Sequence, residues 1–264
     1  MKKIYLFIIG ILLIIIIILI PDILVLRKKT PINEGGAENN LQFSVVSISQ
    51  TDSFYNIQVE YPQFKNVDPA FNQKISELIT GEIDAFKKDS KDNWEARRAT
   101  APPENPVPEN PTTPFDFIAS WTPTQLNNKY LSFVINIYSF SGGAHGITEV
   151  NAFNYDVAKK KEITMTDFLN SSPQSLEKLS QLAAQEVTSQ LESSGVQIDD
   201  NLKQMIQQGT QPTSDNYNNF NFNYNSLIIY FEQYQVAPGY IGPVTITFYR
   251  STLSENSISS DYLQ

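Results

Sequence analysis

The sequence predicts an α+β fold in which a mixed, mostly antiparallel sheet packs against two or three helices, preceded by a single transmembrane helix. Three observations support this prediction. An apolar run opens the chain, segments rich in β-branched and aromatic residues precede and follow stretches of helical periodicity, and strands do not alternate regularly with helices.

The composition of the 264-residue chain excludes several classes of site. It contains no cysteine, which excludes disulfides, thiol nucleophiles and cysteine-ligated metal centres. It contains one histidine, His145, so no site can use two imidazoles of the same chain. The formal net charge of −9 disfavours nonspecific binding to phosphate backbones. We therefore expect no nucleic-acid partner, no metal and no cofactor.

The N-terminus carries the features of a membrane anchor. Residues 4–20 are uncharged and rich in isoleucine, and a helix from Ile4 to Leu26 would span roughly 34 Å, enough to cross a bilayer. No small-x-small cleavage site follows the run, which favours an uncleaved anchor over a cleaved signal peptide. Basic residues flank both ends, so they leave the orientation nearly undecided. We expect residues 1–29 to be the anchor with its basic flanks, residues 30–40 a tether and residues 41–250 the folded domain. Residues 251–264 then form a polar tail.

The sequence of residues 41–140, the first half of the domain, predicts two strands, a helix and two further strands. Residues 41–50 and 54–61 are rich in β-branched and aromatic residues, and the second segment alternates apolar with polar side chains, as half-buried strands do. Asp68 and Pro69 are suited to the start of a helix, and apolar residues then recur with helical spacing from Phe71 to Phe86. Six prolines between residues 101 and 114 predict an extended loop. Residues 115–121 and 130–140 have strand character again.

The sequence of the second half of the domain predicts one more strand, then two or three helices, and then further strands. Residues 147–157 have strand character, residues 176–191 carry an amphipathic helical pattern, and residues 198–209 suggest a shorter helix. Residues 227–231 and 244–249 are apolar enough for closing strands.

The segment Ser141-Gly-Gly-Ala-His-Gly146 is the most unusual part of the sequence. Glycines around a lone histidine permit positive φ and a close approach of the backbone to a ligand. Two interpretations remain open: a ligand-binding loop that uses Tyr138, Gly142, Gly143, His145 and Gly146, or a strand-to-strand turn whose histidine bonds a nearby carbonyl. The segment is neither a phosphate loop nor a nucleophile elbow.

Two other groups of residues deserve a functional interpretation. Glu149, Asp156, Glu162 and Asp167 are close in sequence, but a glycosidase needs a carboxylate pair at a defined separation, and Asp167 is better suited to capping a helix. Tyrosines at 230, 234 and 240 form either a carbohydrate-stacking platform or sheet packing, with packing the simpler expectation. We expect no catalytic residue, and we include Tyr240 among the ligand-binding candidates.

Several motifs together resemble a domain-of-unknown-function family (DUF3298/DUF4163-like). They are Tyr138-Ser-Phe-Ser-Gly-Gly-Ala-His-Gly146, Phe153-Asn-Tyr-Asp156 and Ile163-Thr-Met-Thr-Asp-Phe-Leu169, with further similarity at residues 59–75 and 227–243. The family includes the extracytoplasmic part of RsiV-type anti-sigma factors and the N-terminal part of PdaC-type peptidoglycan deacetylases. The resemblance covers residues 41–250 and implies an extracytoplasmic location for the domain.

The sequence departs from the larger members of that family. An anti-sigma factor needs a cytoplasmic sigma-binding segment, which residues 1–3 cannot supply. A deacetylase needs a metal-binding domain with several histidines, whereas this chain has one. We therefore expect a non-enzymatic binding module, held in the lipid bilayer through residues 4–26, that binds peptidoglycan or a lysozyme-like protein. A carboxylate-based glycan-acting enzyme and a structural subunit of an envelope complex remain alternatives.

Overall fold

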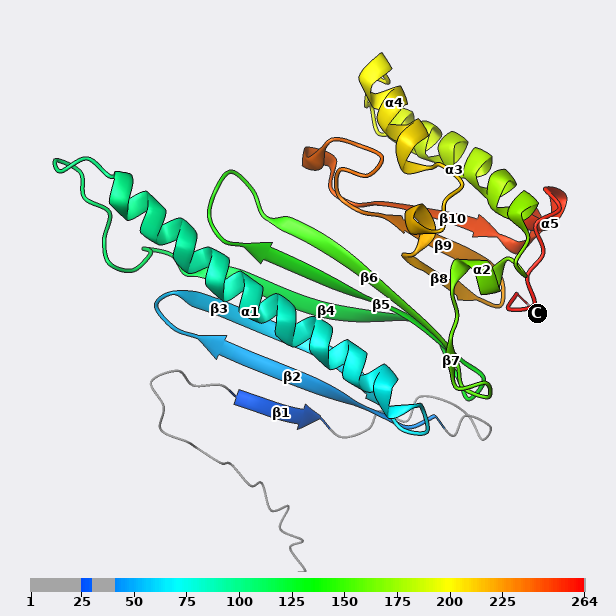
Figure 1. Cartoon of the computed structure of the whole chain (residues 1–264), viewed down its shortest axis with the longest axis horizontal. Helices are drawn as coiled ribbons and strands as arrows, with labels where there is room; N and C mark the ends of the chain where they lie inside the picture. Colours follow the sequence, from blue (N-terminus) through cyan, green and yellow to red (C-terminus); the bar gives the residue numbers. More distant parts are fainter. Residues whose placement is uncertain (1–24, 30–40, 264) are drawn as a thin grey trace, which may run out of the picture.

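The computed structural model describes residues 25–29 and 41–263, and they form a mixed α+β fold with mostly antiparallel strands. The expected single sheet is in fact two sheets. A seven-stranded sheet has the order β1-β2-β3-β4-β5-β6-β7, and a three-stranded sheet has the order β10-β9-β8. Figure 1 shows the second sheet beside the first, with its own helices around it.

The seven-stranded sheet follows the chain order from one edge to the other. Its pairs are antiparallel except for β3 and β4, which are parallel because helix α1 lies between them in sequence. Its strands are β1 (Val25–Lys29), β2 (Phe43–Thr51), β3 (Tyr55–Phe64), β4 (Phe115–Leu126), β5 (Tyr130–Phe140), β6 (Ile147–Asp156) and β7 (Lys161–Glu162).

Helix α1 (Pro69–Thr100) covers one face of this sheet (Figure 1). Asp68 caps its start, because the side chain accepts a hydrogen bond from the Ala70 amide at 2.9 Å. The expected apolar stripe from Phe71 to Phe86 is buried, and the charged stretch that follows continues the helix into solvent. The helix ends before Pro102, and the Trp94 indole fixes the proline-rich segment by donating to the carbonyl of Glu109 at 3.0 Å.

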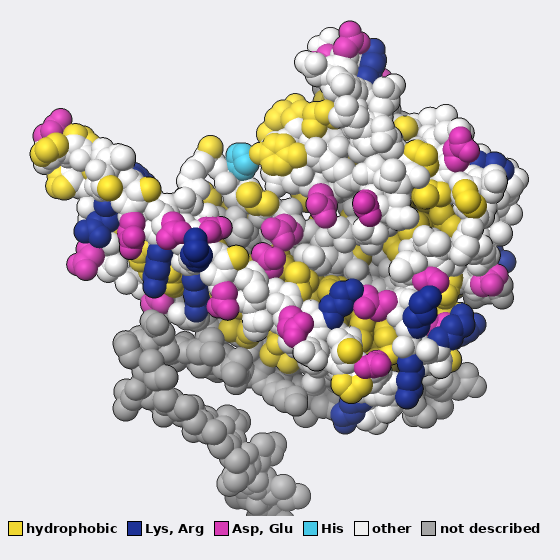
Figure 2. All heavy atoms as spheres, viewed as in Figure 1, with side chains coloured by type: hydrophobic (Ala, Val, Ile, Leu, Met, Phe, Trp, Pro, Cys, Tyr) yellow, Lys and Arg dark blue, Asp and Glu magenta, His cyan; other side chains and the backbone are white. Residues whose placement is uncertain are grey.

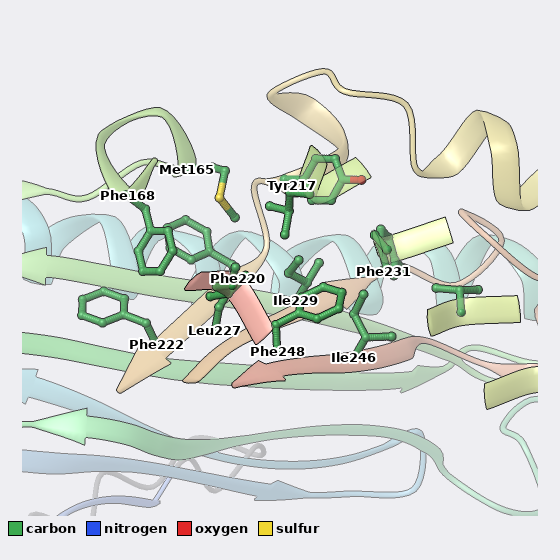
Figure 3. Packing of buried hydrophobic residues seen from close by; sticks show 14 of the residues in the cluster. Met165, Phe168, Tyr217, Phe220, Phe222, Leu227, Ile229, Phe231, Ile246 and Phe248 are labelled. Atoms are coloured by element: carbon green, nitrogen blue, oxygen red, sulfur yellow. The ribbon is translucent and has the colours of Figure 1, made fainter. Parts of the chain in front are cut away.

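The second layer contains a three-stranded sheet of β8 (Phe220–Asn223), β9 (Ser226–Phe231) and β10 (Val244–Tyr249). The longest helix beside it is α3 (Pro173–Ser193), and aromatic and aliphatic side chains fill the space between sheet and helices (Figure 3). The shorter helical segments are α2 (Met165–Phe168), α4 (Asp200–Gly209), η1 (Asp215–Tyr217), η2 (Gly239–Ile241) and α5 (Arg250–Glu255).

The expected polar tail at residues 251–264 was wrong. Leu253, Ile258, Tyr262 and Leu263 are buried in the same core as Phe168 and Phe222. These side chains recur at short intervals among serines, which conceals their apolar contribution in a composition-based interpretation. The domain therefore continues to Leu263.

The two sheets meet through buried polar side chains. Strand β8 contacts β4, β5 and β6, on the face opposite α1. Ser132 Oγ donates to Asn154 Oδ1 at 2.7 Å and accepts from the Phe222 amide at 2.9 Å. Asn154 donates to the Phe220 carbonyl at 2.6 Å, and Asn221 donates to the Phe133 carbonyl at 3.0 Å. Because all three side chains are buried, these bonds fix how the sheets align.

Most of the expected anchor and the whole tether, residues 1–24 and 30–40, lie outside the described residues. Val25 and Leu26, expected to end the membrane helix, instead belong to strand β1, which pairs antiparallel with β2 from Val25 opposite Ser49. Within residues 25–29 and 41–263, no helix is both long and apolar enough to cross a membrane.

Candidate functional site

The loop between β5 and β6 brings together five of the six predicted ligand-binding residues. Tyr138 lies near the end of β5, and the loop residues Gly142, Gly143, His145 and Gly146 follow. Gly142 and Gly143 have φ values of +98° and +110°, a region that favours glycine. The sequence-based expectation of positive φ in this segment is therefore confirmed.

Packing explains part of the glycine requirement. The ring of Tyr138 lies over Gly146, where an added Cβ would come within 2.4 Å of the ring. A Cβ on Gly142 would be 3.4 Å from the buried ring of Phe115. Asn93 of α1 donates to the carbonyl of Ser141 at 3.3 Å. The loop is therefore held in shape by the strand before it and by α1.

His145 is exposed at the tip of this loop. Its Nδ1 lies 2.9 Å from the carbonyl oxygen of the adjacent Gly146, a local contact. The contact orients the ring of this exposed side chain. This geometry agrees with both interpretations of the loop, since the histidine bonds a neighbouring carbonyl and also presents its edge to solvent.

Gln233 joins this region to the segment that contains Tyr240. Its Oε1 accepts from the Thr148 amide of β6 at 3.2 Å, and its Nε2 donates to the Gly239 carbonyl of η2 at 2.6 Å. Tyr240 follows directly and is 78% exposed. Figure 2 shows the histidine side chain next to a group of hydrophobic side chains at the surface.

Tyr234 adds a second exposed ring beside η2. The side chain is 56% exposed, and the residue has a φ of +72°, which is uncommon for a bulky side chain. Its ring packs on Gly239, where an added Cβ would lie 2.1 Å from Cζ. The expectation that these tyrosines serve sheet packing was wrong for Tyr234 and Tyr240, because both rings lie at the surface. Tyr230 is partly buried.

A hollow of about 390 Å³ lies next to Tyr234. It is bordered by segments that are separate in sequence: η1 and the residues after it on one side, and β9 and the turn after it on the other. Its lining consists of tyrosines, carboxamides and carboxylates: Asp215, Asn216, Asn219, Tyr230, Glu232, Gln233, Tyr234 and Gln235. This composition suits a polar ligand with a flat apolar face.

Three of the four carboxylates considered from the sequence have structural partners. Asp156 is buried and pairs with Lys159, and Glu162 pairs with Lys74. Asp167 caps α2 by accepting from the Thr164 amide at 3.0 Å, as expected, and it also pairs with Lys161. These ion pairs and the helix cap give the three carboxylates a structural role.

Glu149 differs from them. Partial removal from solvent and the nearby charges of Glu82 and Glu232 raise the pKa of Glu149. No group of three or more His, Cys, Asp or Glu side chains suited to a metal ion is found in the described part of the chain.

Sequence reasoning missed the residues that assemble the hollow. Asn219 and Gln233 bond backbone amides of β6, although they are separated from that strand by more than 60 residues. Glu232 and Asp215 resemble ordinary surface acids in the sequence. The apolar run of β9 followed at once by Glu-Gln-Tyr-Gln marks the place where a buried strand reaches the surface, and this was the available signal.

Comparison with protein families gives two adjoining matches. The model described as "Deacetylase PdaC" matches residues 48–148, and the model described as "Protein of unknown function (DUF3298)" matches residues 166–251. The first match ends within two residues of Gly146, and the second includes η1, β8, β9 and η2. The candidate site therefore combines residues from both matched regions.

A curated relative and two solved structures resemble the chain. Peptidoglycan-N-acetylmuramic acid deacetylase PdaC of Bacillus subtilis is 26% identical over 231 residues, which are 87% of this chain and 45% of the relative. This chain therefore spans less than half of that relative's length.

The solved structures are DUF3298 family proteins from Bacteroides fragilis and Pseudomonas aeruginosa, with TM-scores of 0.55 and 0.51. The first is 16% identical and the alignment covers 82% of this chain and 93% of that one. The second is 13% identical, with coverage of 92% and 95%. At these identities the likeness concerns the fold.

Proposed function

Because this chain belongs to the DUF3298/PdaC-type family, we propose that it is a non-enzymatic binding module of the bacterial cell envelope, anchored by its N-terminus and exposed outside the cytoplasm. The anchor rests on the apolar run at residues 4–20. The ligand that we propose is cell-wall glycan.

One observation carries the proposal: two segments distant in sequence are joined by hydrogen bonds, and each carries exposed aromatic rings. Gln233 bonds Thr148, two residues after the histidine loop, and Gly239, the residue before Tyr240, so it joins the two segments. Exposed tyrosines offer flat faces for sugar rings and hydroxyls for hydrogen bonds. Asp156, Glu162 and Asp167 each pair with a lysine, which favours a structural role over glycan hydrolysis for these three carboxylates.

The relationship to the Bacillus subtilis deacetylase supports a role at the cell wall. The match leaves more than half of that relative uncovered, so the similarity does not by itself assign deacetylation to this chain. A shared glycan-binding part accounts for the similarity without requiring shared chemistry.

The proposal is tested by calorimetric titration of the full chain, in detergent micelles, with purified muropeptides. We expect saturable binding with fixed stoichiometry. Tyr240→Ala and His145→Ala should each weaken binding about tenfold, a loss typical of one stacked ring or one good hydrogen bond. Tyr224→Ala is the matched control, because Tyr224 is 70% exposed but lies at the opposite end of the β8–β9 hairpin. Equal losses in all three variants, or no binding by the unaltered chain, would contradict the proposal.

A basic protein such as a c-type lysozyme is the second candidate ligand, and the acidic surface is the observation that favours it. The chain carries a net charge of −9, and acidic side chains are spread over the face that carries the histidine (Figure 2). Titration with lysozyme at low and near-physiological salt separates recognition from charge. Binding that disappears at the higher salt would be long-range attraction alone.

A carboxylate-based enzyme remains the third candidate, with Glu149 as its only suitable group among the four considered. Its raised pKa is a property of many acid catalysts. Incubation with peptidoglycan followed by analysis of the products tests this candidate. Turnover that Glu149→Gln abolishes would replace the binding-module proposal with an enzymatic one.

A further inference from the structure

Every side-chain amide that lines the hollow beside Tyr234 donates at least one hydrogen bond within the protein, and the amides of Asn216 and Gln235 have both hydrogens engaged. Both hydrogens of the Asn216 amide are directed at backbone carbonyls, those of Gln208 and Gln211, each at 3.1 Å. The Gln235 amide similarly donates to the carbonyls of Gly209 and Asn216, at 3.0 and 3.1 Å.

The other two carboxamides are also committed. Asn219 accepts from the Ala152 amide at 3.1 Å and donates to Glu232 Oε1 at 3.0 Å. Gln233 accepts from Thr148 and donates to Gly239. All four amide groups therefore hold the walls of the hollow together, and each directs at least one hydrogen away from a ligand.

The remaining charge of the hollow is negative. Asp215 and Glu232 line it, and no lysine or arginine is among its lining residues. Glu232 receives one hydrogen bond, on Oε1, so its second oxygen can accept from a ligand. These groups would repel an anionic ligand, whereas an ammonium group would donate hydrogen bonds to them and balance their charge.

The ring of Tyr234 indicates which class of ligand carries the ammonium group. The ring lines the same hollow, and it is held in place by its contact with Gly239. A ring held at the edge of an acidic hollow suits a sugar whose apolar face stacks while its amine reaches the carboxylates. A flexible lysine side chain offers the charge but not the flat face.

We infer that this hollow binds an amino sugar whose amine is free, with the ammonium between Glu232 and Asp215 and the sugar ring against Tyr234. The inference rests on the proposed glycan-binding function and names the form of glycan that it selects. An N-acetylated sugar lacks the positive charge that the two carboxylates attract, so the hollow distinguishes a de-N-acetylated unit from an acetylated one.

The test is calorimetric titration of the full chain with a glucosamine tetramer and with an N-acetylglucosamine tetramer, in slightly acidic buffer in which the free amines are protonated. We expect the glucosamine tetramer to bind at least tenfold more tightly. Glu232→Gln should remove most of this preference, because glutamine keeps the bond from Asn219 and loses the charge. Glu192→Gln, an equal charge change on exposed α3, is the control and should preserve the preference.

A second variant separates the ring from the charge. Tyr234→Asn removes the ring while keeping a residue that tolerates positive φ, so the turn is retained. We expect both tetramers to bind about tenfold more weakly. A tetralysine peptide is the third ligand, and it should bind less tightly than the glucosamine tetramer and be insensitive to Tyr234→Asn.

Three results would overturn the inference: equal affinity for both tetramers, tighter binding of tetralysine than of glucosamine, or no binding of either cation. If one of these results is obtained and the Glu232→Gln variant still binds muropeptides, the inference about the hollow fails and the proposed function stands. Loss of muropeptide binding in Tyr240→Ala with an intact glucosamine preference would separate the two sites.

Discussion

The ring of Tyr234 lies directly on Gly239, five residues further along the chain, so that an added Cβ would approach Cζ to 2.1 Å. Tyr234 also has a φ of +72°, a conformation that costs a bulky residue free energy. The contact with Gly239 therefore holds an exposed ring in one place, next to the hollow.

Replacing Gly239 with alanine should displace this ring. Because Tyr234 is more than half exposed, the ring can move aside, and we expect the free energy of unfolding to change by less than about 1 kcal/mol. Glycan affinity should fall about tenfold, as in the variant that lacks the ring. Tyrosine ring signals in nuclear magnetic resonance spectra, together with a titration, would measure both effects. An unmoved ring would mean that the backbone of η2 yields instead.

A glycine at the surface of α1 provides a contrasting prediction. Gly81 lies in the middle of the helix, is exposed, and has nothing within 4 Å of an added Cβ. Gly81→Ala should raise the free energy of unfolding by about 0.5–1 kcal/mol, because alanine loses less backbone entropy in a helix. Chemical denaturation measures this change. A loss of stability would show that another molecule or segment packs against this position.

Asp167 gives the fold a defined dependence on pH. Burial opposes its ionisation, but hydrogen bonds from Lys161 and Thr164 outweigh burial and lower the pKa from 3.8 to about 2. The ionised form is thus favoured by folding. Its contribution is complete above the ordinary pKa and is lost as the pH falls through about 4 to about 2.

Asp167→Asn should therefore cost about 1–2 kcal/mol at neutral pH, and the cost should shrink toward pH 2. Urea denaturation of both proteins at several pH values tests this prediction. A difference that stays constant across the acid range would assign the effect to the shape of the cap rather than to its charge.

A substitution in the polar contact between the two sheets should lower the free energy of unfolding more than Asp167→Asn does. Asn154→Ala removes the acceptor of the Ser132 hydroxyl and the donor to the Phe220 carbonyl. Both the hydroxyl and the carbonyl would then be buried without these partners. Each unsatisfied buried group costs about 1–3 kcal/mol, so we expect the two groups to cost about 2–6 kcal/mol. Thermal unfolding measures it. Asn93→Ala is a control, because its bond to Ser141 lies at the surface and should contribute less than about 1 kcal/mol.

Local patterns predicted much of this fold. The helix of residues 69–100 begins at Asp68 and Pro69 as expected, since a capping side chain and a proline in the first turn are both encoded locally. Strands β3, β5 and β6 likewise follow from alternating or continuous apolar side chains. The separation of β8, β9 and β10 into a second sheet was not predictable, because its contact with the first sheet depends on Ser132, Asn154 and Asn221, which come together only in the tertiary structure.

The candidate site was predicted only in part, because some of its features are local and others depend on contacts between distant elements. The glycines at 142 and 143 were informative because positive φ is a property of single residues. The role of Gln233 was hidden, since it consists of hydrogen bonds to Thr148 and Gly239 on different elements. An exposed Tyr240 was expected as a ligand contact, whereas the exposure of Tyr234 was not foreseen, because its turn follows an apolar strand without a glycine at the strained position.

The contact between Ser132, Asn154 and Asn221 also bears on how such chains diverge. Ser132 and Asn221 belong to different matched regions, residues 48–148 and 166–251. A recombination event that exchanged one region for that of a distant relative would bring an unmatched side chain to this buried junction, and the hybrid would lose stability. We therefore expect a hybrid of two distant relatives to keep its stability only if the side chains on both sides of this junction are exchanged together.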